Sequence, residues 1–598
     1  MTRGGLPSGP VDATLHSSRP DASSGLRSAI VLMLLVCAAY GNSLYGPFVL
    51  DDVPQIVENQ RIHSLWPPGP LLMGSERPIA ELSLALNYAI GGVNVLGYHL
   101  VNVGIHLVNA LLLFGIVRRA LRSERFAERY GDSADKLALV IAGLWVVHPL
   151  QTQGITYIVQ RHESLMSCFY LATLYATARY AGSGARALAW AIFAFVVSAL
   201  GMATKQVMVT APLVCLLFDR CIFAGSFRAA LQKRLPLYVG LCVSWAALFL
   251  AMGGNLWDAE EAGFIGRDPL SPIEYLLTQT GILLHYLGLC VWPATLVFDY
   301  GWPVADGLVE RVVPTLIVSS LGAWSVWALW KRPGAGLLGA TFFLILAPTS
   351  SFMPIADLAF EHRMYLPSAA VIALLVLAVQ RAVQARVPNA TKLLSVLALL
   401  ALAGLTVRTS RRNCDYHSAV SLWQTVVRDA PENPRGYINL GIAYAQEARD
   451  PAAAREILEE ALLMNPGNVR VLVNLAGALM AQGEHQAAIV HLRKVLGVEP
   501  DNAEVLANLG MALGASGDAR GAIRQLERAL ELAPGLRGAW NNLGVMHLQE
   551  GQLESAVRAF ERAVELDAHA KEARANLERA RKRLLRRQAR GESKPADG

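Results

Sequence analysis

Apolar stretches long enough, or nearly long enough, to cross a lipid bilayer recur through the first 410 residues of this 598-residue chain. A membrane-spanning helix needs about 20 apolar residues, and a backbone in lipid must satisfy its hydrogen bonds within the helix. Composition is 53% apolar and 17% charged, which excludes a single soluble domain and predicts an all-α fold with a polytopic membrane domain over 28–410. The eleven expected spans lie near 28–45, 96–117, 137–150, 164–181, 187–203, 206–222, 235–252, 311–330, 335–348, 367–384 and 393–408.

Three segments of this region need separate interpretation. Residues 1–27 are rich in Ser, Gly, Pro and Asp, which predicts a disordered cytoplasmic leader. Residues 28–45 contain a small-residue sequence typical of signal-peptide cleavage sites, but we favour an uncleaved anchor. Residues 273–292 are interrupted by polar side chains, which favours an interfacial helix over another span.

The basic residues predict the orientation of the spans. Connections rich in Lys and Arg face the cytoplasm, and here they are 118–136, 220–234, 331–332 and 385–392. The loops 46–95, 151–163, 253–310 and 349–366 then lie outside, together with everything after residue 408, although Arg408, Arg411 and Arg412 oppose the rule at that exit. The net charge of +6 is scattered over span ends rather than gathered on one face, so no nucleic-acid partner is expected.

The C-terminal part is a repeat array. Asn-Leu-Gly or Asn-Leu-Ala begins at Asn439, Asn474, Asn508 and Asn542, and prolines 431, 466, 500 and 534 keep the same period of 34 or 35 residues. This is the tetratricopeptide-repeat pattern, and it predicts an α-solenoid over 411–588, closed by a charged helix at 571–588 and followed by a disordered tail at 589–598. Such arrays present a concave groove, so we expect it to hold a protein or peptide partner; a packing module without a ligand is the alternative.

Two adjacent acids and a polar helix face are the first candidate functional residues. Asp51 and Asp52 follow the first span on the outer side, where Asp52 capping a short helix at Pro54 would explain only one of them. His99, Asn102 and His106 share one face of the second span. Interhelical hydrogen bonding is the simplest role for that face, ahead of a His/His metal pair. The seven cysteines show neither disulfide nor zinc spacing, and no metal site is predicted.

Isolated cations at the outer ends of several spans form the second candidate group. Each could be an ordinary headgroup contact, but all are expected on the side of the acid pair. Together they could hold a lipid phosphate while a base acts beside it. The residues are Arg77, Arg161 with Glu163, Lys205, and Glu361, Arg363 and Tyr365 of the sequence EHRMYLP.

The order of these residues, followed by the repeats, resembles the transmembrane and tetratricopeptide-repeat protein O-mannosyltransferases, a family of GT-C glycosyltransferases. The resemblance implies transfer of a sugar from a polyprenyl-phosphate carrier to a protein hydroxyl outside the membrane. It implies Asp51 or Asp52 as catalytic base, Arg77, Arg161, Lys205, Arg363 and Tyr365 as substrate-binding residues, and His99, Asn102, His106, Glu163 and Glu361 as their support. This chain has Lys205-Gln206 where the family commonly has Lys-Glu.

Two readings of function differ in class. The first is a lipid-dependent glycosyltransferase whose repeats gather the acceptor protein; a glycan or lipid acceptor is a narrower variant of it. The second is a non-catalytic membrane scaffold whose repeats recruit envelope proteins. Composition favours a bacterial inner membrane, which would place the repeats in the periplasm. The resemblance implies membrane lipid and a lipid-linked sugar as partners; no cofactor is assigned, and a divalent-metal requirement stays open.

Overall fold

The computed structural model describes residues 22–73, 75–182, 184–251, 270–388, 390–567 and 570–590. Most of the predicted leader and the last eight residues of the predicted tail lie outside these ranges. The chain divides into two compact units. The membrane unit comprises residues up to Leu296 and Pro303–His417, and the repeat unit comprises Val297–Trp302 and residues from Ser418 onward.

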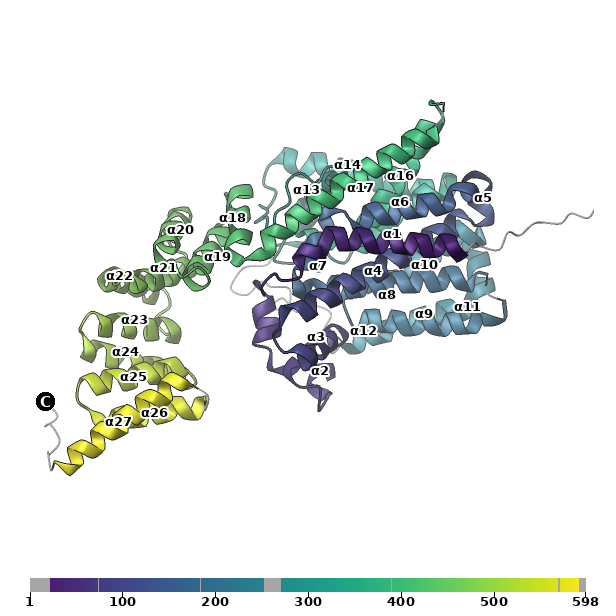
Figure 1. The fold of residues 1–598 in the computed structure, drawn as a ribbon. Helices are drawn as coiled ribbons and strands as arrows, with labels where there is room; N and C mark the ends of the chain where they lie inside the picture. The colour runs from purple at the N-terminus through teal and green to yellow at the C-terminus, as the bar shows by residue number, and fades with distance from the viewer. Residues whose placement is uncertain are drawn as a thin grey trace, which may run out of the picture. The chain divides into compact units, whose positions relative to one another are not determined.

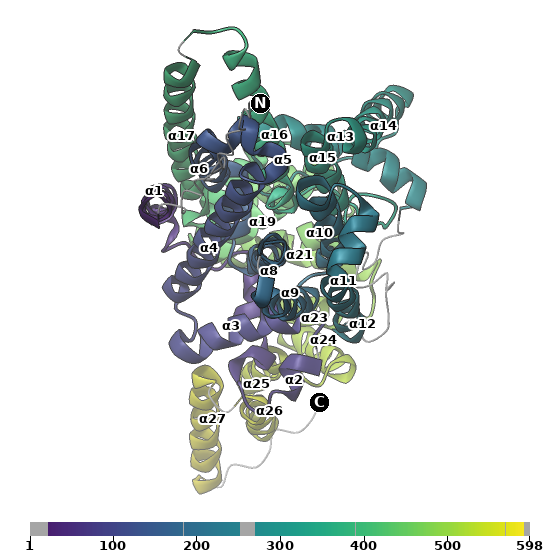
Figure 2. The same ribbon diagram turned by 90° about the vertical axis from the view of Figure 1, so that its right-hand side faces the viewer.

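Every regular element in the described part of the chain is helical, as the sequence predicted (Figure 1). In the membrane unit α8 lies between α4, α9 and α10 (Figure 2). The α-helices of this unit are α1 (Ala22–Tyr40), α2 (Gly69–Met73), α3 (Pro78–Gly91), α4 (Val95–Leu121), α5 (Glu124–Tyr130), α6 (Ala134–Val146), α7 (Thr152–Thr156), α8 (Arg161–Tyr180), α9 (Ala187–Met202), α10 (Ala211–Asp219), α11 (Phe227–Val243), α12 (Trp245–Ala251), α13 (Pro272–Val291), α14 (Leu308–Lys331), α15 (Pro333–Leu346), α16 (Pro367–Gln384) and α17 (Ala390–Cys414).

Helices occur at all eleven expected spans, but fewer meet the demands of a bilayer by themselves. Among the described residues, eight helical segments are long and apolar enough to cross, or nine if the bent pair Glu124–Val146 and Pro149–Thr156 counts as one span. The difference has a physical cause at α8 and α15. The first turn of α8 carries buried charged side chains, and α15 has only 14 residues.

Arg412, which opposed the predicted orientation, is fully buried rather than displayed at the membrane surface. Its Nη1 lies 2.9 Å from Asp415 Oδ2, and its Nη2 lies 3.8 Å from Oε2 of buried Glu361. Two carboxylates therefore compensate its charge inside the protein. A buried, paired arginine of this kind carries little information about topology, which removes one objection to an external C-terminal region.

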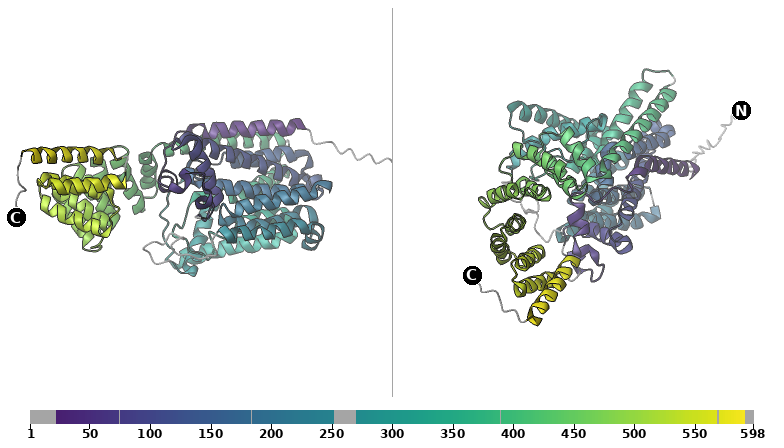
Figure 3. Two further views of the ribbon diagram at one scale, coloured as in Figure 1. Left: turned by 90° about the horizontal axis from the view of Figure 1, so that it is seen from below. Right: turned by 60° about the vertical axis from the view of Figure 1, so that its left-hand side comes forward.

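The repeat unit stacks antiparallel helix pairs along an arc (Figure 3). Gly510 shows why the repeats need small residues: a Cβ there would lie 2.7 Å from Leu526 Cγ of the paired helix. A larger residue there would force the paired helices apart. The helices are α18 (Ala419–Asp429), α19 (Pro434–Gln446), α20 (Pro451–Met464), α21 (Val469–Ala481), α22 (His485–Leu496), α23 (Ala503–Ala515), α24 (Ala519–Leu532), α25 (Arg537–Gln549), α26 (Leu553–Leu566) and α27 (Lys571–Ala589).

A short segment from the loop before α14 completes the beginning of the repeat unit. Phe298 is fully buried, and its ring meets Trp423 edge-on at 5.5 Å between centroids. Asp299 Oδ2 lies 2.8 Å from Arg435 Nε, and Asn433 Nδ2 donates to the Asp299 carbonyl at 2.9 Å. The sequence predicted only an external loop over 253–310, whereas Val297–Trp302 packs against α18 and α19.

Candidate functional site

Residues 157–163, called here the turn 157–163, comprise the connection between α7 and α8 and the first residues of α8, and both groups of candidate residues converge on them. The turn contains the short 3-10 helix η6 (Ile158–Gln160) and is almost wholly buried. Asn102 of α4 fixes it from inside, because its Nδ2 donates to the carbonyls of Ile155 at 3.0 Å and Ile158 at 3.2 Å. The predicted polar face of α4 therefore braces this turn.

Asp52 is a buried structural acceptor. Its Oδ1 accepts the Val159 N–H at 2.7 Å, and its Oδ2 accepts the Val49 N–H at 3.0 Å. The proposed cap is wrong in detail: a single π-helical turn η2 (Val53–Val57) does begin here with Pro54, but the Asp52 side chain makes no capping bond to it. Burial raises the pKa of Asp52 to about 8, although the two backbone N–H groups oppose the shift. With both oxygens occupied, Asp52 is a poor base.

Asp51 has the opposite environment, because its side chain is exposed. The preceding residue, Leu50, adopts the left-handed conformation with φ of 47°, which costs energy for a residue other than glycine. The Asp51 N–H donates to the Tyr157 hydroxyl at 3.0 Å. The strained backbone and this bond present an accessible carboxylate at the end of the first span.

Arg161 is committed to protein acceptors. It is fully buried, and its guanidinium donates to Asn102 Oδ1 at 2.7 Å and Asn87 Oδ1 at 2.6 Å, and to the carbonyls of Ser83 and Tyr98 at 3.1 and 3.0 Å. These bonds join α3, α4 and α8. Phosphate binding by Arg161 stays a prediction, but the geometry favours a bracing role.

The next two residues of α8 enter a cluster of basic side chains. His162 Nδ1 lies 3.1 Å from Nη1 of half-buried Arg77, and Glu163 Oε2 lies 2.5 Å from Lys205 Nζ. His362 lies near the same cluster. After burial, the groups that lower its pKa are Lys205, Arg363, Arg77 and His162. Three basic side chains, Arg77, Lys205 and Arg363, thus gather around two histidines, with Glu163 as the acid paired to Lys205.

Burial and the neighbouring cations lower the pKa of both histidines in this basic cluster. Burial, and then the charges of Arg77 and Lys205, hold the pKa of His162 well below its usual value of 6.5. Burial, and then Lys205 and Arg363, do the same for the pKa of His362. Burial also lowers the pKa of Lys205, and the Glu163 carboxylate opposes that shift. A cluster with this excess of positive charge is suited to an anionic ligand such as a phosphate.

Arg363 reaches the cluster from a loop that it also organises. It lies in the 3-10 helix η10 (Glu361–Met364), and its guanidinium donates to the carbonyls of Leu358 at 2.9 Å and Asp357 at 2.5 Å. From α13, Gln279 Nε2 donates to the same Leu358 carbonyl at 2.9 Å. The expected interfacial helix therefore supports the loop that carries Arg363.

The remaining predicted residues hold the bundle together. His99 Nε2 lies 3.0 Å from the Gly46 carbonyl, which ties α4 to the end of the first span. His106 Nδ1 lies 2.7 Å from the Tyr365 hydroxyl, which also accepts from Asn109 Nδ2 at 3.0 Å. Tyr365 is fully buried in this network. Its substrate contact and the supporting roles of His106 and Glu361 stay predictions, while the geometry gives Tyr365 a packing role.

Tyr157, His162 and His362 belong to the site but were not among the residues predicted from the sequence. The Tyr157 hydroxyl accepts a hydrogen bond from the Asp51 N–H, 106 positions away in the sequence, and a local spacing pattern cannot predict a contact over that distance. His362 lies in the sequence EHRMYLP, of which only Glu361, Arg363 and Tyr365 were predicted site residues. Within the described residues, no group of three or more His, Cys, Asp or Glu side chains is placed to hold a metal ion.

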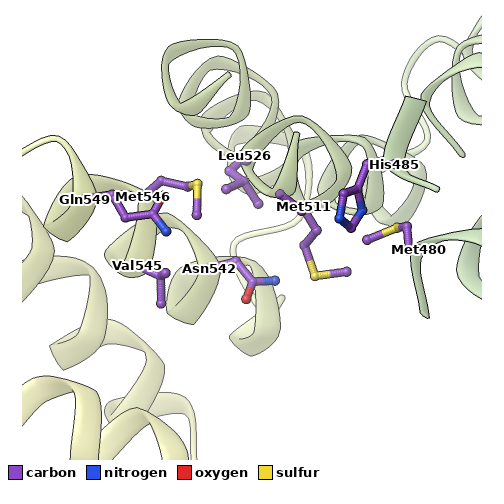
Figure 4. Close-up of a pocket in the computed structure, with 10 residues that line it drawn as sticks. Met480, His485, Met511, Leu526, Asn542, Val545, Met546 and Gln549 are labelled. Atoms are coloured by element: carbon purple, nitrogen blue, oxygen red, sulfur yellow. The ribbon is translucent and has the colours of Figure 1, made fainter. Parts of the chain in front are cut away.

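The repeat unit offers a second candidate surface, a hollow of about 390 Å³ (Figure 4). Helices α21 to α25 line it with methionines, small residues and neutral polar side chains. None of the described lining residues is an acid, lysine or arginine. They are Met480, His485, Met511, Gly514, Ala515, Leu526, Asn542, Val545, Met546 and Gln549.

Fold and site together define a helical membrane protein with a C-terminal tetratricopeptide-repeat array. Models described as "Tetratricopeptide repeat" match residues 445–507, 479–543 and 538–570. Among solved structures, MamA is 22% identical, with 27% of this chain and 94% of MamA covered and a TM-score of 0.24.

Over most of its length the chain is similar to named transferases. It is 23% identical over 505 residues to Protein O-mannosyl-transferase TMTC3 of Mus musculus, which covers 76% of this chain and 53% of the relative. It is 26% identical over 451 residues to Protein O-mannosyl-transferase F38B6.6 of Caenorhabditis elegans, which covers 70% and 60%. The chain thus spans between about half and three fifths of the length of these curated relatives.

Proposed function

We propose that the chain is a membrane glycosyltransferase of the GT-C type that moves a sugar from a polyprenyl-phosphate carrier to Ser or Thr of extracytoplasmic proteins. Mannose is the proposed sugar, because the similar proteins are named O-mannosyl-transferases. One observation carries the proposal: the turn 157–163 bonds Asp51 through Tyr157 and enters the basic cluster through His162 and Glu163. The proposed base and the proposed phosphate site are thus both contacted by side chains from seven consecutive residues.

The proposed chemistry uses these two parts. An acceptor hydroxyl holds its proton too tightly to attack unaided, so the Asp51 carboxylate takes that proton as the oxygen bonds to the anomeric carbon. The bond from that carbon to the carrier phosphate breaks, and its electron pair leaves with the phosphate. Arg77, Lys205 and Arg363 stabilise the departing anion, so no separate general acid is required. Attack from the side opposite the phosphate inverts the anomeric configuration.

The surroundings of the site set the proposed location. The loops that carry Asp51, Arg77 and Arg363 contain few basic residues, which favours the outer side of the membrane. We place the chain in a bacterial inner membrane with the site and the repeats facing the periplasm. The uncharged, methionine-lined hollow of α21–α25 supports docking of an acceptor segment of low charge.

A reconstituted transfer assay tests this function. Purified full-length chain is mixed with polyprenyl-phosphate [³H]mannose and Ser/Thr-containing peptides, and label in the peptide is counted. We expect transfer, and for Arg77→Gln a rise in donor KM of about 10- to 150-fold, as loss of a hydrogen bond to a charged group predicts. Arg311→Gln, in the first turns of α14 and paired with Asp306 and the Ala305 carbonyl, is the control. Absence of transfer from any polyprenyl-phosphate sugar would favour the scaffold.

A further inference from the structure

Tyr157 stands out among the buried residues of the turn because its polar end meets the proposed base. The residue is 3% exposed and follows the end of α7, where its backbone leaves the helical conformation. Its hydroxyl oxygen accepts the Asp51 N–H at 3.0 Å. A phenol has one proton to donate, and the pKa of Tyr157 is raised well above its usual value by burial, by the Asp51 and Asp52 charges, and by a side-chain hydrogen bond to Asp51.

We propose that Tyr157 is a positioning residue that orients the Asp51 carboxylate toward the acceptor hydroxyl, an inference that rests on the proposed function. The hydroxyl contacts both the backbone and the side chain of Asp51, so it fixes the carboxylate relative to the chain. Its own position is fixed in turn, because Asn102 holds the carbonyls on either side of Tyr157. The left-handed Leu50 leaves the Asp51 backbone strained and in need of such an anchor.

The hydrogen bond from Tyr157 sets the direction of the expected pH effect on Asp51, beside the charges nearby. Asp52 is the neighbouring acid, and Arg161 lies near Asp52. A hydroxyl that donates to a carboxylate favours the ionised form and lowers the pKa of that carboxyl. Removal of the Tyr157 hydroxyl therefore raises the pKa of Asp51. Because a base must be deprotonated to act, the acid limb of the rate profile moves to higher pH.

Tyr157→Phe in the full-length chain tests the inference by the pH dependence of kcat in the mannose-transfer assay. We expect kcat to fall about 10- to 30-fold with donor KM unchanged, the acid limb to move to higher pH, and Tyr157→Phe to cause no further loss when it is added to Asp51→Asn. Hydrogen exchange of residues 46–57 should rise as the loop loses its anchor. Tyr170→Phe, whose hydroxyl bonds Thr210 at 3.1 Å in the bundle, is the matched control.

The results of these assays distinguish failure of the positioning role from failure of the proposed function. If the wild-type chain transfers no sugar, the proposed function fails and the positioning role falls with it. If the wild type is active and Tyr157→Phe matches it in kcat and acid limb, the positioning role alone is wrong. Effects of Tyr157→Phe and Asp51→Asn that multiply independently would also overturn it.

Discussion

At the scale of single residues, neighbours in the sequence take opposite roles. Asp51 is exposed, while Asp52 is fully buried with both oxygens occupied. The sequence could place this pair beside the membrane but could not rank its members, because the partners of Asp52 include Val159 at a distance of 107 positions. The same limit applies to Arg161 and His162, of which only the second joins the basic cluster.

The buried histidines of the basic cluster predict how stability depends on pH. The folded chain lowers the pKa of His162 and His362 below 6.5, so it binds fewer protons than the unfolded chain as the medium is acidified. Their contribution is therefore intact above about pH 6.5 and is lost as pH falls, by up to about 1.4 kcal/mol per pH unit for each.

Thermal unfolding of the detergent-solubilised chain between pH 5 and 8 measures this effect. Replacing both residues, His162→Gln and His362→Gln, should flatten the loss of melting temperature on acidification. Comparison of variant with parent cancels the contribution of Asp52, whose raised pKa acts in the opposite direction. His491→Gln in the repeats is a control with a smaller buried fraction. Parallel curves for parent and double variant would show that the imidazoles titrate normally.

At the scale of elements, the sequence predicted helix positions well and tertiary assignments poorly. Apolar runs located all the long helices of the membrane unit, and the period of Asn, Gly and Pro located the repeats. The number of membrane spans is harder to predict, because α8 begins with buried charged side chains and α15 has only 14 residues. Segment 297–302 could not be assigned to the repeat unit from its sequence, because Phe298 and Trp423 are far apart along the chain.

The packing of segment 297–302 predicts that the first repeat helices depend on it. Truncation of a buried Phe costs about 3 to 5 kcal/mol, so Phe298→Ala should raise hydrogen exchange in α18 and α19 while α23–α25 keep their protection. Trp292→Ala, 77% exposed in the same loop, is the control. Unchanged exchange in α18 and α19 would show that the segment adds nothing to their stability.

At the scale of the whole molecule, the arrangement of charge predicts which regions face outward. The basic connection 118–136 is expected inside, and the loop before α14 and the repeats outside. Exposed Cys37, Cys242 and Cys414 are first replaced by Ser to lower the background. Single cysteines at Asp306 and Leu463, whose side chains are highly exposed, should then react with an impermeant maleimide in intact spheroplasts, and one at exposed Asp132 should not. Labelling of the cysteine at position 132 alone would show that the orientation is the opposite of the predicted one.

The central claim, that Asp51 is the base of a sugar transfer supported by the basic cluster, is tested most directly by three aspartate variants in the purified transfer assay. Asp51→Asn should lower kcat by roughly 10²- to 10⁴-fold with an unchanged melting temperature, as loss of a general base predicts. Asp52→Asn should mainly lower the melting temperature, because one buried N–H loses its acceptor. Asp306→Asn, 91% exposed in the loop before α14, should match the wild type. Wild-type kcat in Asp51→Asn would contradict the account.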